Sequence, residues 1–193
     1  MPALPLSPTA SGFFDRDVCD LARSLIGATL MVRGVGGTIL ETEAYGRNDP
    51  ASHSFSGPTR RNAAMFGPPG SVYVYLSYGC HLCLNVVGRE GEAVLFRAIW
   101  PCAGQDIMAQ RRGNPTTSRL LASGPGRLGQ ALNVALDDNG QRFDDGAFSI
   151  IGTECAAPDI LVGPRIGVTK AADRPWRFGL AGSVGISRPF PPQ

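Results

Sequence analysis

Residues 71–99 place the tightest constraint on the fold, because they contain three runs of β-forming residues separated by two short turn sequences. Strands joined by turns this short pair antiparallel. The chain is therefore expected to contain an antiparallel sheet whose first hairpin ends at Tyr78-Gly79. The runs are 71–77, 80–87 and 92–99, and the turns are 78–79 and 88–91.

Outside this region, the pattern of apolar residues, glycines and prolines predicts short helices and further strands. A helix over about 16–26 has Asp15 as its N-cap and Gly27 as its end. The fold class is therefore α+β: a single domain with a mostly antiparallel, curved sheet, a protruding β-hairpin and flanking short helices. Residues 1–12 are expected to be a flexible lead and 13–193 the single domain. The other expected elements are a hairpin of 28–33 with 38–45, helices over 103–112, 116–122 and 125–134, and strands near 147–151 and 160–169.

The composition fits one domain of this size. A chain of 193 residues with 43% hydrophobic and 18% charged residues can bury a core and is not disordered. No stretch is long and apolar enough to span a membrane, and no signal peptide is recognisable, so a cytosolic protein is expected. The odd number of cysteines, 5, also fits a reducing compartment.

Cys80, His81 and Cys83 raise the question of a zinc site. A closed zinc site needs four ligands, and no second Cys/His pair stands at a suitable spacing. The cysteines are therefore expected to be structural or incidental, and neither a metal nor another cofactor is expected.

The charges are unevenly distributed, although the net charge is only +2. Residues 47–127 hold nine Arg against four acidic residues, and residues 128–163 hold one Arg against six. One face could thus meet a polyanion, with the acidic segment kept away from it. Chance clustering on solvated faces explains the same counts, and charge alone does not decide between the two.

The expected strand 38–45 places two carboxylates beside an aromatic ring. Alternate side chains of a strand share a face, so Glu41, Glu43 and Tyr45 point the same way. On the pattern alone, a solvated sheet edge is slightly favoured over a functional face.

The expected hairpin has an apolar face, an aromatic face and an aromatic tip. Tyr73 and Tyr75 would lie opposite the core face, and Tyr78 would stand at the tip, where a ring has little to pack against. An exposed aromatic on a rigid hairpin suits a wedge that fills the gap left when a base leaves the DNA stack. The residues expected to point into the core are Val72, Val74 and Leu76.

Residues 46–70 form a long segment without helical or strand periodicity. Long irregular segments in compact domains are usually functional or disordered. His53 and the group Arg60-Arg61-Asn62 favour a functional loop.

Several short motifs occur in an order that resembles one known family, the 3-methyladenine (alkyladenine, hypoxanthine) DNA glycosylases. The resemblance covers about residues 20–185, nearly the whole chain. The motifs are Glu41-Thr42-Glu43-Ala44-Tyr45, Ala51-Ser52-His53-Ser54, Thr59-Arg60-Arg61-Asn62 with Met65-Phe66, Val72-Tyr73-Val74-Tyr75 with Tyr78-Gly79, Leu84-Asn85-Val86, Leu95-Phe96-Arg97-Ala98 and Ser123-Gly124-Pro125.

The resemblance implies a catalytic pair and a base pocket. Glu43 would be the general base that activates the attacking water, while Arg97 would help to hold the water and keep Glu43 ionised. In the pocket, His53 would also bind the edge of the flipped base, and Asn85 would crowd the exocyclic amine of guanine. The implied pocket residues are Tyr45, His53, Tyr75 and Asn85.

The resemblance also implies contacts with DNA. Tyr78 matches an intercalating wedge. Cys80 departs from the family pattern, in which a larger side chain stands beside the wedge, and Glu41 matches no catalytic role and is treated as structural. The implied groove and backbone contacts are Thr59, Arg61, Met65, Cys80, His81 and Arg127.

The implied activity is that of a monofunctional DNA repair glycosylase, acting as a monomer on double-stranded DNA that contains damaged purines. It would flip an alkylated or deaminated purine (3-methyladenine, hypoxanthine or ethenoadenine type) and hydrolyse its N-glycosidic bond, leaving an abasic site. A lyase step would need an amine nucleophile. Only Lys170, the sole lysine, or the N-terminus could serve, and Lys170 stands in a loop-like segment far from every motif, so no lyase activity is expected.

Two other functions stay open. A carbohydrate hydrolase could use Glu41 and Glu43 as an acid–base pair, but it would not need an aromatic at a hairpin tip or an Arg-rich loop. A non-catalytic DNA damage-binding module would keep Tyr78 and the arginines, but it would not need a carboxylate in the pocket.

Overall fold

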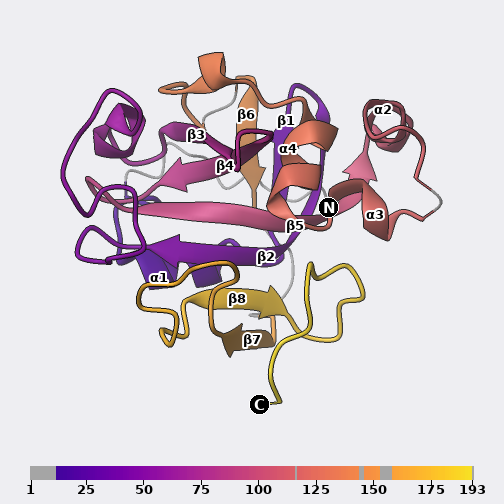
Figure 1. Cartoon of the computed structure of the whole chain (residues 1–193). Helices are drawn as coiled ribbons and strands as arrows, with labels where there is room; N and C mark the ends of the chain where they lie inside the picture. Colours follow the sequence, from indigo (N-terminus) through magenta and orange to yellow (C-terminus); the bar gives the residue numbers. More distant parts are fainter. Residues whose placement is uncertain (1–11, 116, 144–145, 153–157, 193) are drawn as a thin grey trace.

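Eight strands pair into one curled antiparallel sheet in the part of the chain that the computed structural model describes, residues 12–192 without 116, 144–145 and 153–157 (Figure 1). The strand order is β3-β4-β5-β2-β1-β6, and β8 pairs with both β2 and β7. The strands are β1 Thr29–Val32, β2 Val35–Tyr45, β3 Val72–Ser77, β4 His81–Val87, β5 Ala93–Ala103, β6 Phe148–Ile151, β7 Ile160–Gly163 and β8 Arg177–Leu180.

Short helices flank this sheet, so the expected α+β class is confirmed. In Figure 1 the long strands β2 and β5 cross the middle of the molecule, with α2 and α3 at one side and β7 and β8 below. The expected lead over 1–12 lies outside the described residues, apart from Gly12. The helices are α1 Val18–Ser24, α2 Gln105–Arg111, α3 Arg119–Ala122 and α4 Pro125–Leu132, with 3-10 turns η1 Ala63–Phe66 and η2 Leu136–Asp138.

The first helix starts later than expected. Asp17, not Asp15, is the N-cap of α1, because its carboxylate accepts hydrogen bonds from the backbone N–H groups of Cys19 and Asp20. Asp15 instead lies 3.4 Å from Arg89 in an exposed ion pair.

Two glycines expected in a turn belong to strand β2. The turn between β1 and β2 is made by Arg33 and Gly34, which both have positive φ. A Cβ on Gly36 would lie 2.0 Å from the carbonyl oxygen of Leu30, and one on Gly37 would lie 2.0 Å from that of Trp100. These glycines are therefore needed for close backbone approach inside the sheet.

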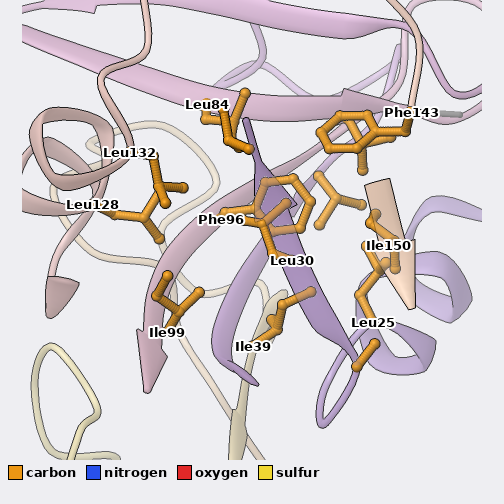
Figure 2. Close-up of a cluster of buried hydrophobic side chains, with 14 of the residues drawn as sticks. Leu25, Leu30, Ile39, Leu84, Phe96, Ile99, Leu128, Leu132, Phe143 and Ile150 are labelled. Atoms are coloured by element: carbon orange, nitrogen blue, oxygen red, sulfur yellow. The ribbon is translucent and has the colours of Figure 1, made fainter. Parts of the chain in front are cut away.

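The hydrophobic core lies between the curled sheet and its helices (Figure 2). Phe96 of β5 and Leu30 of β1 are fully buried at its centre, and α4 adds Leu128 and Leu132. A Cβ on Gly129 would lie 2.0 Å from the carbonyl oxygen of Leu82, so α4 presses directly on β4.

Two other expectations about strands are corrected. Leu76, expected in the core, is 41% exposed, because the β3–β4 pair continues beyond the packed core. The strand expected over 160–169 ends at Gly163, where Pro164 follows and the chain leaves the sheet. Strand β8 was not expected at all.

No helix in the described part of the chain is long and apolar enough to cross a membrane.

Candidate active site

One pocket of about 600 Å³ opens between β2, β3, β5 and the loop that follows β2. This volume lies within the range of sites for small organic groups. Its lining includes most of the residues that the sequence motifs singled out, together with a segment after β7. Among the lining residues are Glu43, Tyr45, His53, Met65, Tyr73, Tyr75, Tyr78, Cys83, Asn85, Arg97, Pro125, Ile166, Lys170 and Arg188.

Glu43 lies on β2, and its side chain is fully buried at the pocket. The hydroxyl of Tyr45 donates a hydrogen bond of 2.8 Å to Oε2, and the backbone N–H of Ile166 donates one of 2.7 Å to Oε1. Arg97 adds an ion pair, with Nη1 3.2 Å from Oε2. The carboxylate is thus held by three donors from three segments.

Burial dominates the acidity of Glu43. It raises the pKa above the usual 4.5, and the charge of Arg97 and the hydrogen bonds from Ile166 and Tyr45 only partly offset it. As expected, Arg97 lowers the pKa of Glu43. Burial raises that pKa by more, so the overall change is an increase.

The solvated edge favoured for Glu41 and Glu43 is wrong, since both carboxylates have no exposed surface. Strand β2 is central: β5 pairs along one side of it, and β1 and β8 pair along the other. Both carboxylates are buried, and a buried charge is costly unless it is paired: Arg97 contacts both of them, and Arg177 lies 3.3 Å from Glu41.

Arg97 is the cation between the two carboxylates. It lies on β5 at a register shift, where Glu41 pairs with Ala98 and Thr42 with Phe96. Its Nε donates a hydrogen bond of 2.8 Å to Glu41, while Nη1 faces Glu43.

Aromatic rings line the pocket beside this carboxylate. The rings of His53 and Tyr75 meet edge to face with centroids 4.6 Å apart, and those of Tyr73 and Tyr75 stack at 5.8 Å. A hydrogen bond of 2.8 Å joins His53 Nδ1 to the hydroxyl of Tyr73. Partial burial and the charge of Arg61 lower the pKa of His53, which favours the neutral ring.

Asn85 and Cys83 complete the floor from β4. The amide nitrogen of Asn85 donates hydrogen bonds to the carbonyl oxygens of Tyr73, at 3.0 Å, and Cys83, at 3.2 Å, which fixes its orientation. The thiol of Cys83 contacts the Tyr75 hydroxyl, and burial raises the pKa of that thiol.

Tyr78 stands at the turn between β3 and β4 and is 86% exposed. Its φ of 49° is a left-handed conformation that non-glycine residues adopt at a cost. The backbone N–H of Cys80 closes the turn by donating to the carbonyl of Ser77 at 3.1 Å. The chain therefore holds a large ring in solvent at the mouth of the pocket.

The residues expected to contact DNA fall into two groups. Met65 is buried against Tyr73 and lines the pocket, so it lies inside the molecule and not on its surface. The others are exposed, and the Thr59 hydroxyl donates a hydrogen bond to Asn62 within the loop. The exposed members are Thr59, Arg61, Cys80, His81 and Arg127.

Several pocket residues were not expected from the sequence, among them Tyr73, Ile166, Lys170 and Arg188. Tyr73 was expected only to lie on the face opposite the core, and the resemblance assigned no role to the other three. The expectation that Lys170 lies far from every motif is wrong, because Lys170 lines the same pocket as Glu43 and Tyr45.

The reason is the path of the chain after Gly163. Arg165 buries its guanidinium against the carboxylate of Asp49, and it lies 4.7 Å from the centroid of the Tyr45 ring. This pair holds the segment 166–170 over the pocket. An Arg–Asp pair 116 residues apart leaves no local signal in the sequence.

Among the described residues, no group of three or more His, Cys, Asp or Glu side chains could hold a metal ion. Cys80 is exposed and Cys83 is buried.

Comparison with known proteins agrees with this geometry. A model of the methylpurine-DNA glycosylase family matches residues 12–184. A protein of Nitrosospira multiformis is 56% identical over 92% of both chains. A second, of Rhodopseudomonas palustris BisB18, is 54% identical over 97% of this chain and 95% of its own. Both bear the name "Putative 3-methyladenine DNA glycosylase".

With a buried carboxylate in an aromatic pocket, these matches define a DNA glycosylase, a hydrolase of N-glycosyl bonds in DNA repair. The chain belongs to the methylpurine-DNA glycosylase family. The resemblance found in the sequence motifs is thereby confirmed.

Proposed function

We propose that this enzyme flips an alkylated or deaminated purine out of double-stranded DNA into the pocket and hydrolyses its N-glycosidic bond with a water activated by Glu43. The substrates would be of the 3-methyladenine, hypoxanthine and ethenoadenine type, and the product an abasic site. The observation that carries this proposal is the fully buried carboxylate of Glu43 in a pocket walled by aromatic rings.

The chemistry requires a negative charge near the sugar. Glycosidic cleavage passes through an oxocarbenium-like state, so the enzyme must stabilise positive charge at C1′ and deliver water to it. An ionised Glu43 does both, because it accepts the proton of the water and attracts the cation. Arg97, Tyr45 and the Ile166 N–H support the ionised form against the effect of burial.

The aromatic walls favour electron-poor bases. Alkylation at a ring nitrogen makes a purine cationic, and a cation is attracted to the faces of Tyr45 and Tyr75. A neutral His53 can accept or donate a hydrogen bond at the edge of the base. Asn85, fixed by its two backbone hydrogen bonds, would crowd the exocyclic amine of guanine.

The exposed residues around the pocket suit a duplex. Tyr78 would fill the gap left by the flipped base. Arg61 and Arg127 would contact the backbone, where positive side chains supply most of the affinity. Every residue in this scheme comes from one chain, so a monomer suffices.

The release of the base would proceed without strand cleavage. Lys170 lines the pocket and is the sole lysine, so it is the side chain to test for a Schiff base. Lys170 is exposed, whereas Glu43 is fully buried at the pocket. Water activated by Glu43 is therefore the proposed nucleophile, and borohydride should trap no adduct with lesion DNA. A trapped adduct that disappears in Lys170→Arg would establish a lyase step and overturn this part of the proposal.

The central test measures base release from end-labelled duplexes that carry one hypoxanthine, ethenoadenine or alkylated purine, read with and without alkali. Breaks that appear only after alkali indicate an abasic site without lyase cleavage. Glu43→Gln should lower the rate by at least about a hundredfold while lesion binding stays nearly intact. Glu90→Gln, at a carboxylate with 69% exposure, is the matched control and should act like the native protein.

Two results would contradict the proposal. No release from any duplex, with binding intact, would indicate a non-catalytic damage-binding module. Loss of binding in Glu43→Gln would indicate that Glu43 is structural.

A further inference from the structure

Arg97 depends on more than its contact with Glu43. Each nitrogen of its guanidinium has a partner. Nε lies 2.8 Å from Glu41 and Nη1 lies 3.2 Å from Glu43, while Nη2 donates a hydrogen bond of 3.2 Å to the Ser187 hydroxyl. Glu41 is fully buried, and nothing in the proposed chemistry uses it directly. Two of the three partners therefore stand outside the reacting pair.

Ser187 and Glu41 hold each other as well as Arg97. The backbone N–H of Ser187 donates to Glu41 Oε2 at 2.6 Å, and its hydroxyl donates to Oε1 at 2.9 Å. Hydrogen bonds to an ionised carboxylate are stronger than those between neutral groups. Ser187 lies beyond residues 12–184, where the family model matches, so this contact belongs to the C-terminal segment of this chain.

The C-terminal segment is anchored by Arg177, whose Nε lies 3.3 Å from Glu41 Oε1 in an ion pair. Arg177 of β8 donates hydrogen bonds to the carbonyl oxygens of Arg188, at 2.7 Å, and Pro189, at 3.1 Å. Its guanidinium also lies 3.7 Å from the centroid of the Phe190 ring. That ring occupies the space above Gly179, where a Cβ would meet it at 2.5 Å. The anchor thus fixes the backbone on the far side of Ser187.

A free arginine side chain loses rotamer freedom when it is held in one conformation. Contact with Glu43 alone would leave the guanidinium free to rotate about its Nη1 edge. Partners at Nε and Nη2 prevent that rotation, so Nη1 faces Glu43 in one orientation.

We propose that Glu41 and Ser187 are positioning residues for the base-release reaction, which hold Arg97 against Glu43 and thereby make the C-terminal segment part of the active site. This inference rests on the proposed function of Glu43. It assigns a role to Glu41, which the sequence left as structural, and to a segment that no motif covers.

The first experiment compares single-turnover base release with lesion-duplex affinity in Ser187 variants. Ser187→Ala removes the hydroxyl and keeps the backbone N–H, so we expect a rate about tenfold lower with unchanged affinity. Ser187→Thr keeps a hydroxyl and should stay within about twofold of the native rate. Ser183→Ala is the matched control, because its hydroxyl accepts a hydrogen bond from Gly185 in the same segment.

The second experiment reads the position of Arg97 without any reaction. The Nε–H group of a held arginine exchanges slowly with solvent, and its NMR resonance can be assigned through its loss in Arg97→Lys. Exchange should accelerate about tenfold or more in Ser187→Ala and Glu41→Gln and stay native in Ser183→Ala.

The outcomes separate the two ideas. Native exchange and native rate in Ser187→Ala would overturn the positioning role. An equal loss of rate in Ser187→Ala, Ser187→Thr and Ser183→Ala would also overturn it and indicate general loosening. No base release by the native protein, with faster Nε–H exchange in Ser187→Ala, would contradict the proposed function while upholding the Ser187 contact.

Discussion

At the scale of single residues, Glu43 combines two requirements that oppose each other. Its burial beside stacked rings suits the proposed chemistry, but it raises the pKa of the carboxyl and so disfavours the ionised form that the chemistry needs. Arg97, Tyr45 and the Ile166 N–H offset part of this cost. Keeping Glu43 ionised in this buried position therefore lowers the stability of the folded protein.

This conflict predicts the pH dependence of base release. The reaction needs ionised Glu43, and the pKa of Glu43 lies above 4.5, so the rate should fall as the pH drops through that raised value. Single-turnover rates measured from pH 4 to pH 8 would show an acid limb above the usual range for glutamate. A rate that stays flat down to about pH 4 would contradict the upward shift.

The same shift predicts how stability changes with pH. Since the folded pKa of Glu43 is raised, the folded state binds more protons than the unfolded state, and stability is lost as the pH rises through the folded pKa. Glu43→Gln removes that loss, so its melting temperature should exceed the native one most at neutral pH. The difference should shrink below about pH 4, where both forms are neutral. Glu90→Gln, at an exposed position, should show no such pH-dependent difference.

At the scale of secondary-structure elements, the sequence predicted the β3–β4 hairpin. It predicted the range of strand β2 in part, but not that β2 is paired along both edges. Alternating apolar and aromatic residues with a tight turn at Tyr78 define the hairpin locally. For β2 the same alternation placed Glu41 and Glu43 on one face, but it could not reveal that β5 and β8 pair along its two edges. Edge or centre is a property of the sheet and not of the strand.

The hairpin turn predicts the effect of losing the Tyr78 ring. Tyr78→Ala keeps the turn and removes the exposed ring, so we expect weaker flipping, seen as roughly 5- to 100-fold weaker lesion binding. Base fluorescence of a reporter opposite the lesion measures the flipped population. Leu76→Ala, at an exposed residue of the same hairpin, should leave that population unchanged. Native flipping in Tyr78→Ala would show that the ring is not a wedge.

The packing of Phe190 on Gly179 makes a prediction for the C-terminal segment. In Gly179→Ala the new Cβ would lie 2.5 Å from the ring, so Phe190 must move and the hydrogen bonds from Arg177 should weaken. We expect lower base release with little change in DNA affinity, although Gly179 lies on β8 and does not line the pocket. Phe190→Ala, which removes the ring contact with Arg177 without creating a clash, should lower base release in the same direction. A native rate in Gly179→Ala would show that the anchor does not matter.

At the scale of the whole molecule, the pocket is assembled from segments far apart in the sequence. Strand β2 provides Glu43, β5 provides Arg97, and the segments after β7 and β8 provide Ile166 and Arg188. The exposed basic side chains beside this pocket are where the protein should meet DNA, whereas α1 packs on the opposite face of β2 through the hydrogen bond from Thr42 to Ala22.

This arrangement predicts the salt dependence of binding. Arg61→Ala should weaken binding to lesion and undamaged DNA alike, and it should lower the slope of log affinity against log salt by about 0.9 for one lost phosphate contact. Titrations over a range of salt concentrations measure both effects. Arg23→Ala on α1, where the guanidinium lies 4.6 Å from the Phe178 ring, should change neither. A change confined to lesion DNA would place Arg61 at the base and not at the backbone.

The sequence by itself determined most of the elements and the family. Local alternation, turn residues and caps specify the strands, the hairpin tip and most of the helices, because these depend on neighbouring residues. Ordered motifs also identified the family and the candidate pocket residues.

Only the tertiary structure decided which groups meet. Contacts between distant segments bury Glu41 and Glu43 and bring Lys170 to the pocket. They also form the hydrogen bond from Arg97 to the Ser187 hydroxyl. Such contacts form when the sheet curls and the connecting segments pack over it. They arise from burial and charge pairing across the whole domain, which no short stretch of sequence encodes.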